Sequence, residues 1–190
     1  INMEHHYLIT DPIPAFIERD REIPVMRDSL TAGYFRQEQN SGLIGIYEHT
    51  GAVEAWAPKG VPEWASESEL FTEDLDRLMP WLGNALKRMP VLADAGIKQI
   101  FNGAISHTPD GPPLLGPVAG LKNFWLCCGA SFGIAQGAGC GKYLAQWMLY
   151  GDADINITGL DPRRFGVFAD DPYLRSTVFQ DYCNTFVTPL

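Results

Sequence analysis

The amino-acid sequence predicts an α+β fold in which a strand hairpin and an amphipathic helix are followed by a strand, a glycine turn and a long helix. Three observations carry this prediction. Two strand-like runs, 33–37 and 43–48, are joined by a glycine-containing loop of hairpin length. Apolar residues then recur at spacings of three and four after Thr72, which is a helical period. The uncharged run 123–128 ends at a glycine turn, and a helix is predicted over 131–150.

The first element in chain order is a predicted strand over 4–10, which ends at Asp11 and Pro12. The sequence opens at Ile1 and enters this strand within a few residues, so we expect an N-terminally truncated piece of a longer protein. The hairpin comes next, with its loop expected at 38–42.

A helix is predicted to follow Thr72, whose hydroxyl can cap the first turn. Its expected apolar face consists of Leu75, Leu78, Met79, Leu82 and Leu86. Pro80 lies inside this pattern and should kink the helix or mark its start. A last helix is predicted over 172–186.

Two more strands are predicted in the second half of the chain, at 97–107 and 123–128, separated by a proline-rich turn at 109–113. The run 123–128 is apolar and is expected to be buried on both faces. The helix 131–150 that follows it should end at Gly151.

The start of this helix has two features that suggest a ligand. Gly133, Gly137 and Gly141 lie four residues apart, which indicates close approach of backbone or ligand, or simple close packing against a strand. The turn 129–131 aims unpaired N–H groups and the positive end of the helix dipole at one point. This suits an anionic or carbonyl-bearing ligand, although many such turns bind only water.

Composition excludes several classes of protein. Asp and Glu outnumber Lys and Arg by 23 to 14, and the net charge of −9 has the wrong sign for a nucleic-acid binder. The first twenty residues contain no apolar run, so neither a signal peptide nor a membrane anchor is expected. The uncharged window 123–141 is rich in glycine and is better explained by a buried strand and helix than by a membrane span. We expect a soluble, cytoplasmic protein, with the mitochondrial matrix as the alternative.

Metal and nucleotide motifs are also missing from the sequence. The four cysteines lack zinc or disulfide spacing and are expected to be small core residues in a reducing compartment. The glycine run 137–142 lacks residues that a phosphate loop needs, and Lys142 stands where a dinucleotide motif has its third glycine. His5 and His6 should point to opposite faces of a strand, so no metal site is predicted.

Several sequence blocks occur in a characteristic order. They are His5-His6-Tyr7, Ile23-Pro24-Val25-Met26-Arg27-Asp28, Gly33-Tyr34-Phe35-Arg36-Gln37-Glu38, Asn102-Gly103, Thr108-Pro109-Asp110-Gly111 with Pro113 and Gly116, 129–133, and Leu160-Asp161-Pro162-Arg163-Arg164-Phe165. Together they resemble the FAD-dependent dimethylglycine/sarcosine dehydrogenase family of the D-amino-acid-oxidase-like flavoproteins, over the whole chain.

The resemblance implies a two-part flavoenzyme, of which this chain is the C-terminal half of the oxidoreductase region. Residues 1–100 would form a substrate domain on an antiparallel sheet, with a helix at about 72–89. Residues 101–165 would supply the C-terminal strand and helix of a Rossmann-like FAD domain, and 166–190 a helix and a linker toward an absent domain. The FAD pyrophosphate would bind to an absent N-terminal segment, and an apolar face left by that segment could cause self-association.

The resemblance also places an active-site histidine at His5 and a tyrosine near flavin and substrate at Tyr34. A substrate amine must be neutral before its N-methyl group gives up hydride, and a histidine can accept or relay that proton. Arg36 should share a strand face with Tyr34, where it would hold the substrate carboxylate, with an ordinary salt bridge as the alternative. For His5 the alternative is a satisfied core or surface histidine.

The flavin ring is expected to meet Ser131, Phe132, Gly133 and Ile134, with Pro113 on the same side. A helix N-terminus there would stabilise negative charge on the reduced ring. The predicted function is oxidative demethylation of an N-methyl amino acid such as dimethylglycine or sarcosine, giving formaldehyde or a one-carbon unit trapped by tetrahydrofolate. The alternatives are a non-catalytic regulatory homologue and a generic small-ligand module.

Overall fold

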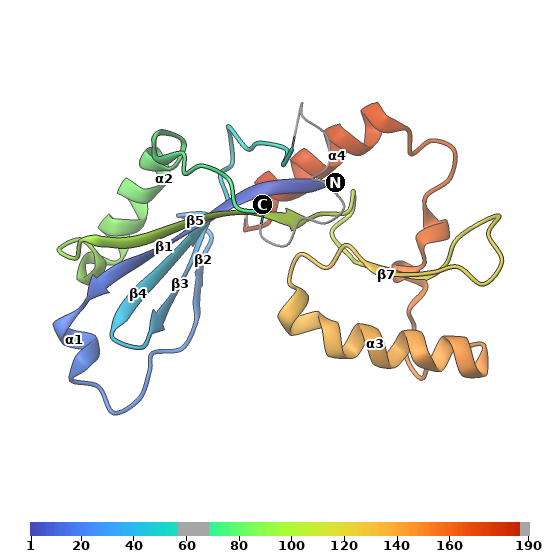
Figure 1. Cartoon of the computed structure of the whole chain (residues 1–190), viewed down its shortest axis with the longest axis horizontal. Coiled ribbons are helices and arrows are strands. Elements are labelled where there is room, and N and C mark those ends of the chain that lie inside the picture. Colours follow the sequence, from blue (N-terminus) through green and yellow to red (C-terminus); the bar gives the residue numbers. More distant parts are fainter. Residues whose placement is uncertain (57–68, 187–190) are drawn as a thin grey trace. The chain divides into compact units, whose positions relative to one another are not determined.

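A computed structural model describes residues 1–56 and 69–186 of the chain, which fold into two compact units (Figure 1). The sheet unit comprises residues 3–105 together with the segment that starts at Tyr182. The hairpin unit comprises residues 1–2 and 106–181. Their predicted roles as substrate domain and FAD-domain fragment stay predictions, and the last four residues of the expected linker lie outside the described part.

The sheet unit is built on five strands in the order β2-β3-β4-β1-β5. They are β1 (Asn2–Pro12), β2 (Met26–Asp28), β3 (Gly33–Glu38), β4 (Ser41–Ile46) and β5 (Ile97–Ser106). The pairs β1–β4, β2–β3 and β3–β4 are antiparallel. The predicted hairpin is confirmed, but its loop is the tighter Gln39–Asn40, where Gln39 takes a positive φ of 54°.

Helix α2 (Leu75–Arg88) packs against this sheet and closes its core. Leu78, Leu82 and Ala85 are buried on one stripe, whereas Met79 is 55% exposed, so its predicted place on the apolar face is wrong. The prediction that Thr72 caps the helix is wrong, because the Asp74 carboxylate accepts the Arg77 N–H instead. Two short elements add to this core: Phe16 comes from helix α1 (Pro14–Ile17), and Leu92 comes from the 3₁₀ turn η1 (Pro90–Leu92). The other core residues are Leu8, Ile13, Phe35, Ile44 and Ile46.

In the hairpin unit, β6 (Leu114–Pro117) and β7 (Trp125–Cys128) pair antiparallel, and α3 (Gly133–Tyr150) packs on them. A Cβ on Gly116 would overlap the Trp147 ring, so a glycine is needed for this close approach. The expectation that β7 is buried on both faces is wrong, because the described sheet has only two strands. Cys127 and Cys128 are therefore exposed rather than core residues, while Cys140 and Cys183 are buried.

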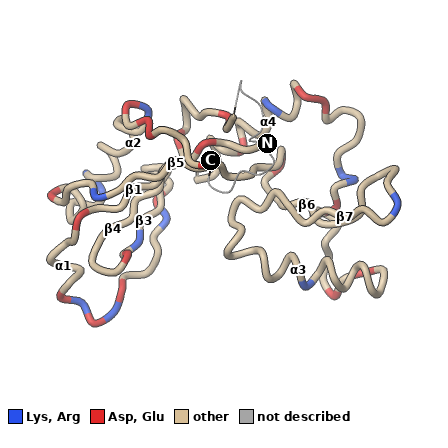
Figure 2. Tube along the Cα trace, in the orientation of Figure 1, with Lys and Arg blue, Asp and Glu red and all other residues tan. Residues whose placement is uncertain are grey.

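Helix α3 ends as predicted at Gly151, which has a left-handed φ of 81°. It begins at Gly133, two residues later than expected. Between Leu114 and Tyr150 only Lys122 and Lys142 are charged (Figure 2). Added Cβ atoms at the stripe glycines 133, 137 and 141 would meet nothing within 4 Å, so close packing within the described chain does not explain them.

The remaining elements are η2 (Thr158–Leu160), η3 (Pro162–Arg164) and α4 (Asp171–Asn184). Helix α4 starts in the hairpin unit, and its last residues from Tyr182 belong to the sheet unit. None of the helices in the described ranges is long and apolar enough to cross a membrane.

Candidate active site

A cluster of aromatic and titratable side chains surrounds His5 in the sheet unit. His5 lies in β1 and is 6% exposed. Its Nε2 atom is 3.1 Å from the Tyr34 hydroxyl, and its Nδ1 atom is 3.3 Å from the Tyr182 hydroxyl. The Tyr47 ring packs beside the imidazole with a centroid separation of 4.3 Å. Strands β1 and β3, the end of β4 and the end of α4 thus meet at one histidine.

Tyr34 is positioned by a glycine across the sheet. In the β3–β4 register Tyr34 faces Gly45, and the tyrosine ring occupies the space that a side chain at this position would fill. Burial raises the pKa of Tyr34 to about 12. Its hydroxyl therefore keeps its proton at neutral pH and can both donate and accept a hydrogen bond.

Replacing Gly45 with alanine is expected to displace Tyr34 and lower the free energy of unfolding by about 1–3 kcal/mol, because the new Cβ would overlap the ring. Gly83 in α2 is a matched control, since a Cβ there meets nothing within 4 Å. The Gly83→Ala change should stabilise the helix by up to about 1 kcal/mol. Urea unfolding followed by tryptophan fluorescence measures both, and a Gly45→Ala variant as stable as wild type would contradict the prediction.

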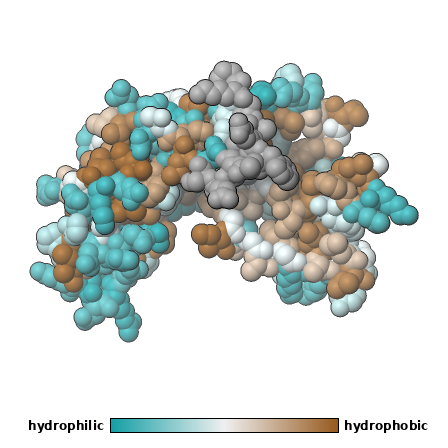
Figure 3. Space-filling view, in the orientation of Figure 1, coloured by the Kyte–Doolittle hydropathy of each residue, from teal (hydrophilic) through white to brown (hydrophobic). Residues whose placement is uncertain are grey.

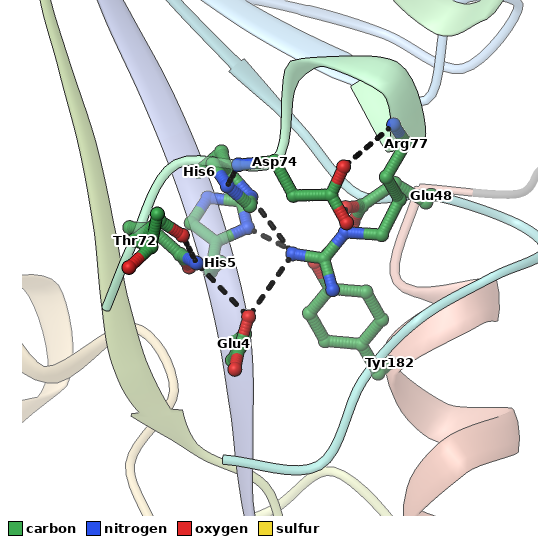
Figure 4. Close-up of polar contacts among 9 residues, drawn as sticks. Glu4, His5, His6, Glu48, Thr72, Asp74, Arg77 and Tyr182 are labelled. Carbon is green, nitrogen blue, oxygen red and sulfur yellow. Dashed lines mark hydrogen bonds and ion pairs between the residues drawn. The ribbon is translucent and has the colours of Figure 1, made fainter. Parts of the chain in front are cut away.

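Behind His5 lies a buried ionic cluster centred on Arg77, whose side chain is 7% exposed (Figure 4). Arg77 Nε is 3.1 Å from Oε1 of the fully buried Glu48, and Nη2 is 3.5 Å from Glu4 Oε2. The Asn102 amide donates to the same Glu4 oxygen at 2.9 Å. The second oxygen of Glu48 accepts a hydrogen bond from the Tyr182 hydroxyl. Because the Tyr182 hydroxyl also contacts His5 Nδ1, it links the ionic cluster to His5.

His6 belongs to the same cluster and lies on the face of β1 opposite to His5. Its Nε2 accepts the Asp74 backbone N–H at 3.1 Å, and its Nδ1 lies 2.9 Å from Arg77 Nη2. If both ring nitrogens of His6 were protonated, their N–H groups would face the Asp74 N–H and Arg77 Nη2, which are themselves donors. The protonated form is therefore disfavoured. Burial, reinforced by the Arg77 charge, lowers the pKa of His6 from 6.5 to about 4. His6 is therefore neutral at physiological pH and helps to anchor the start of α2.

The lowered pKa of His6 makes folding pH-dependent. Because the unfolded chain binds the proton more tightly than the folded chain, stability is complete above about pH 6.5 and falls as the pH drops toward 4. The expected loss is up to roughly 3 kcal/mol. Urea unfolding of wild type and His6→Asn between pH 7 and 4 measures it. The variant should lose less stability over this range, and equal losses would exclude His6 as the cause.

In the described part of the chain, Arg36 forms its ion pair with Glu38, two residues away, and not with the His5 cluster, although Arg36 alternates with Tyr34 along β3 and its charge opposes the rise in the Tyr34 pKa. The Arg36 side chain is half exposed. The ordinary salt bridge that the sequence left open is thus present. A role of Arg36 in binding a substrate carboxylate stays a prediction.

The predicted flavin contacts lie in the hairpin unit, at the start of α3. Phe132 occupies the cap position without a side-chain hydrogen bond, and the first turn carries no acidic residue. Phe132 and Ile134 are exposed, at 43% and 105%, and Gly133 has open space beside it. Pro113 is buried, and its carbonyl accepts a hydrogen bond from Arg164. The open, uncapped helix start fits an electron-rich flavin carbonyl. The role of Pro113 beside the cofactor stays a prediction.

Sequence reasoning named His5 and Tyr34 but missed Glu48, Arg77 and Tyr182. No local pattern could have found these three, because Tyr182 and Glu48 are 134 positions apart. In the described ranges, no group of three or more His, Cys, Asp or Glu side chains is arranged to hold a metal ion.

Comparison with known proteins identifies a family and several relatives. The model of the FAD-dependent oxidoreductase family matches residues 2–147. Mitochondrial dimethylglycine dehydrogenase of Rattus norvegicus is 36% identical over 96% of this chain and 22% of that protein. Mitochondrial sarcosine dehydrogenase of Homo sapiens is 30% identical over 98% of this chain and 20% of that protein. The chain thus spans about a fifth of the length of these relatives.

A solved structure extends the comparison to the fold. L-Proline dehydrogenase from P. horikoshii aligns with a TM-score of 0.67 at 20% identity, covering 86% of this chain and 40% of that one. The mixed α+β architecture with its antiparallel sheet therefore matches part of a larger chain.

Proposed function

Because this chain belongs to the family of FAD-dependent oxidoreductases, we propose that the protein oxidises the N-methyl group of an amino acid such as dimethylglycine or sarcosine. The products would be the demethylated amino acid and formaldehyde, or a one-carbon unit that passes to tetrahydrofolate. The observation that carries the proposal is the pair of the buried His5 and the half-buried Tyr34, joined at 3.1 Å. The names of the relatives support the substrate class.

The pair can remove the proton that blocks this oxidation. An ammonium has no lone pair to stabilise the developing iminium, so the substrate nitrogen must first be neutral. The Tyr34 oxygen accepts the ammonium proton while the Tyr34 hydroxyl proton moves to His5 Nε2. FAD, when bound, supplies the acceptor for the hydride that leaves the methyl carbon. The aromatic rings around His5 keep water from competing for the proton.

The start of α3 is the proposed flavin contact of this chain. Ser131, Phe132, Gly133 and Ile134 would face the ring, and the helix dipole would stabilise its negative charge. The remaining FAD contacts, including those to the pyrophosphate, would come from the N-terminal segment of the protein. Tetrahydrofolate would bind to a C-terminal domain.

The same N-terminal segment is the proposed cover of an apolar surface on α3. Apolar side chains lie at the surface of the hairpin unit (Figure 3), and on α3 they include Met148, Leu149 and Tyr150, which are 53%, 74% and 79% exposed. A patch of this kind favours contact with another protein surface over water. Self-association of the isolated chain would use this patch.

The test is anaerobic reduction of the flavin in the full-length protein. Visible absorbance is recorded before and after addition of dimethylglycine, and in a separate sample sarcosine. Bleaching by one of them would support the proposal and identify the preferred substrate. A bound flavin that neither amine nor any other N-methyl amino acid reduces would contradict it and favour the regulatory homologue.

A further inference from the structure

Glu48 is the buried end of a hydrogen-bond network that reaches His5 through Tyr182. Glu48 has no exposed surface, and its two oxygens face different partners. Oε1 lies 3.1 Å from Arg77 Nε, and Oε2 accepts the Tyr182 hydroxyl proton. Burial raises the pKa of Glu48, while the Tyr182 hydrogen bond and the Arg77 charge oppose this change. A carboxyl group held by a guanidinium and a hydroxyl donor is stabilised as the anion.

Tyr182 connects the Glu48 carboxylate to His5, because its hydroxyl contacts both side chains. Burial and the neighbouring Glu48 charge raise the pKa of Tyr182 well above its ordinary value, so the phenol keeps its single proton. That proton is donated to Glu48. Toward His5 Nδ1, at 3.3 Å, the Tyr182 oxygen can then only accept a hydrogen bond.

We propose that Tyr182, held by Glu48, is a positioning residue that fixes His5 in the tautomer protonated on Nδ1. The Nε2 atom then carries the lone pair and accepts the hydrogen bond from the Tyr34 hydroxyl. In the opposite tautomer, Nε2–H would point at Tyr34, and His5 could not accept a hydrogen bond from that hydroxyl. The arrangement follows the logic of catalytic triads, in which a buried acid orients a histidine whose other nitrogen is the base.

The catalytic consequence rests on the proposed function. When the Tyr34 proton moves to Nε2, the imidazole becomes an imidazolium with protons on both nitrogens. Its Nδ1–H remains donated to Tyr182, and the negative charge of Glu48 lies one hydrogen bond further on. The proton count balances, because the amine loses one proton, Tyr34 exchanges one and His5 gains one. Tyr182 and Glu48 keep their own protonation states throughout.

The first test reads the tautomer directly and needs neither cofactor nor substrate. The 190-residue chain contains four histidines, which can be labelled with ¹⁵N. Long-range ¹H–¹⁵N correlation spectra at pH 7 show which ring nitrogen is protonated, and the His5 signals are assigned with a His5→Gln variant. We expect His5 to be protonated on Nδ1. A His5 protonated on Nε2, or on both nitrogens, would overturn the inference.

The second test removes the Tyr182 hydroxyl and keeps its ring. In Tyr182→Phe nothing at this position accepts the Nδ1–H, so the His5 spectrum should shift toward the Nε2-protonated form. The matched control is Tyr173→Phe on the same helix, which lies outside the network and should leave the His5 signals unchanged. A Tyr182→Phe spectrum identical to that of wild type would contradict the inference. Should this variant fail to fold, the wild-type spectrum still decides.

The third test connects the tautomer to catalysis in the full-length flavoprotein. Tyr182→Phe should slow flavin reduction by at least about tenfold with little change in KM, because the base is misoriented while the substrate-binding groups remain. Tyr173→Phe should react at the wild-type rate. A tyrosine with a purely structural role would not give both the altered tautomer and the loss in kcat. If wild type is not reduced at all but shows the Nδ1 tautomer, the proposed function fails and the structural inference stands.

Discussion

Replacing Arg77 with methionine should lower the free energy of unfolding by about 3–5 kcal/mol. The reason is the charge that the substitution leaves behind. Glu48 is fully buried and Glu4 is only 18% exposed, and both lie beside the guanidinium. Methionine keeps most of the side-chain length but provides no positive charge, so the Glu48 carboxylate loses its ion pair in a place that water does not reach. Urea unfolding at pH 7 measures the effect.

Arg88 on the same helix is the matched control for Arg77. It forms an ion pair of 2.9 Å with Asp28, but its side chain is 55% exposed. The Arg88→Met change should therefore cost less than about 1 kcal/mol. Similar losses in the two variants would show that burial of the cluster does not determine its contribution to stability.

Replacing His5 with glutamine should slow flavin reduction in the full-length protein by roughly 10²–10⁴-fold, the usual contribution of a general acid–base group. Glutamine has an amide oxygen that can accept the Tyr34 hydrogen bond, but it cannot take up a proton near neutral pH. The bound flavin and its spectrum should be unchanged, since the proposed flavin contacts lie in the hairpin unit. Stopped-flow absorbance with a saturating N-methyl amino acid measures the rate.

His49→Gln is the control for this experiment. His49 is half-buried, follows Glu48 in the chain and packs its ring against Trp81 at 5.0 Å, outside the His5 network. Its replacement should leave the rate of flavin reduction within about twofold of wild type. A His5→Gln variant that reacts as fast as His49→Gln would exclude His5 as the proton acceptor.

Local sequence patterns were enough to predict most of the elements of this fold. The hairpin of β3 and β4, the buried stripe of α2 that contains Leu78 and Leu82, and the end of α3 at Gly151 were all predicted. Each depends on residues only a few positions apart, or on a glycine that tolerates a positive φ. The predictions that failed depended on distant contacts. Asp74 rather than Thr72 caps α2 while its own N–H binds His6, and Cys127 is exposed because the described chain does not cover β7.

The sequence by itself determined the elements, the family resemblance and the two residues His5 and Tyr34. Only the tertiary structure decided that they touch, that Gly45 makes room for the Tyr34 ring, and that Tyr182 and Glu48 stand behind the imidazole. The physical reason is that the direction of a hydrogen bond depends on every partner of its donor and acceptor. Those partners come from a strand, a second strand and a C-terminal helix, which only the folded chain brings together.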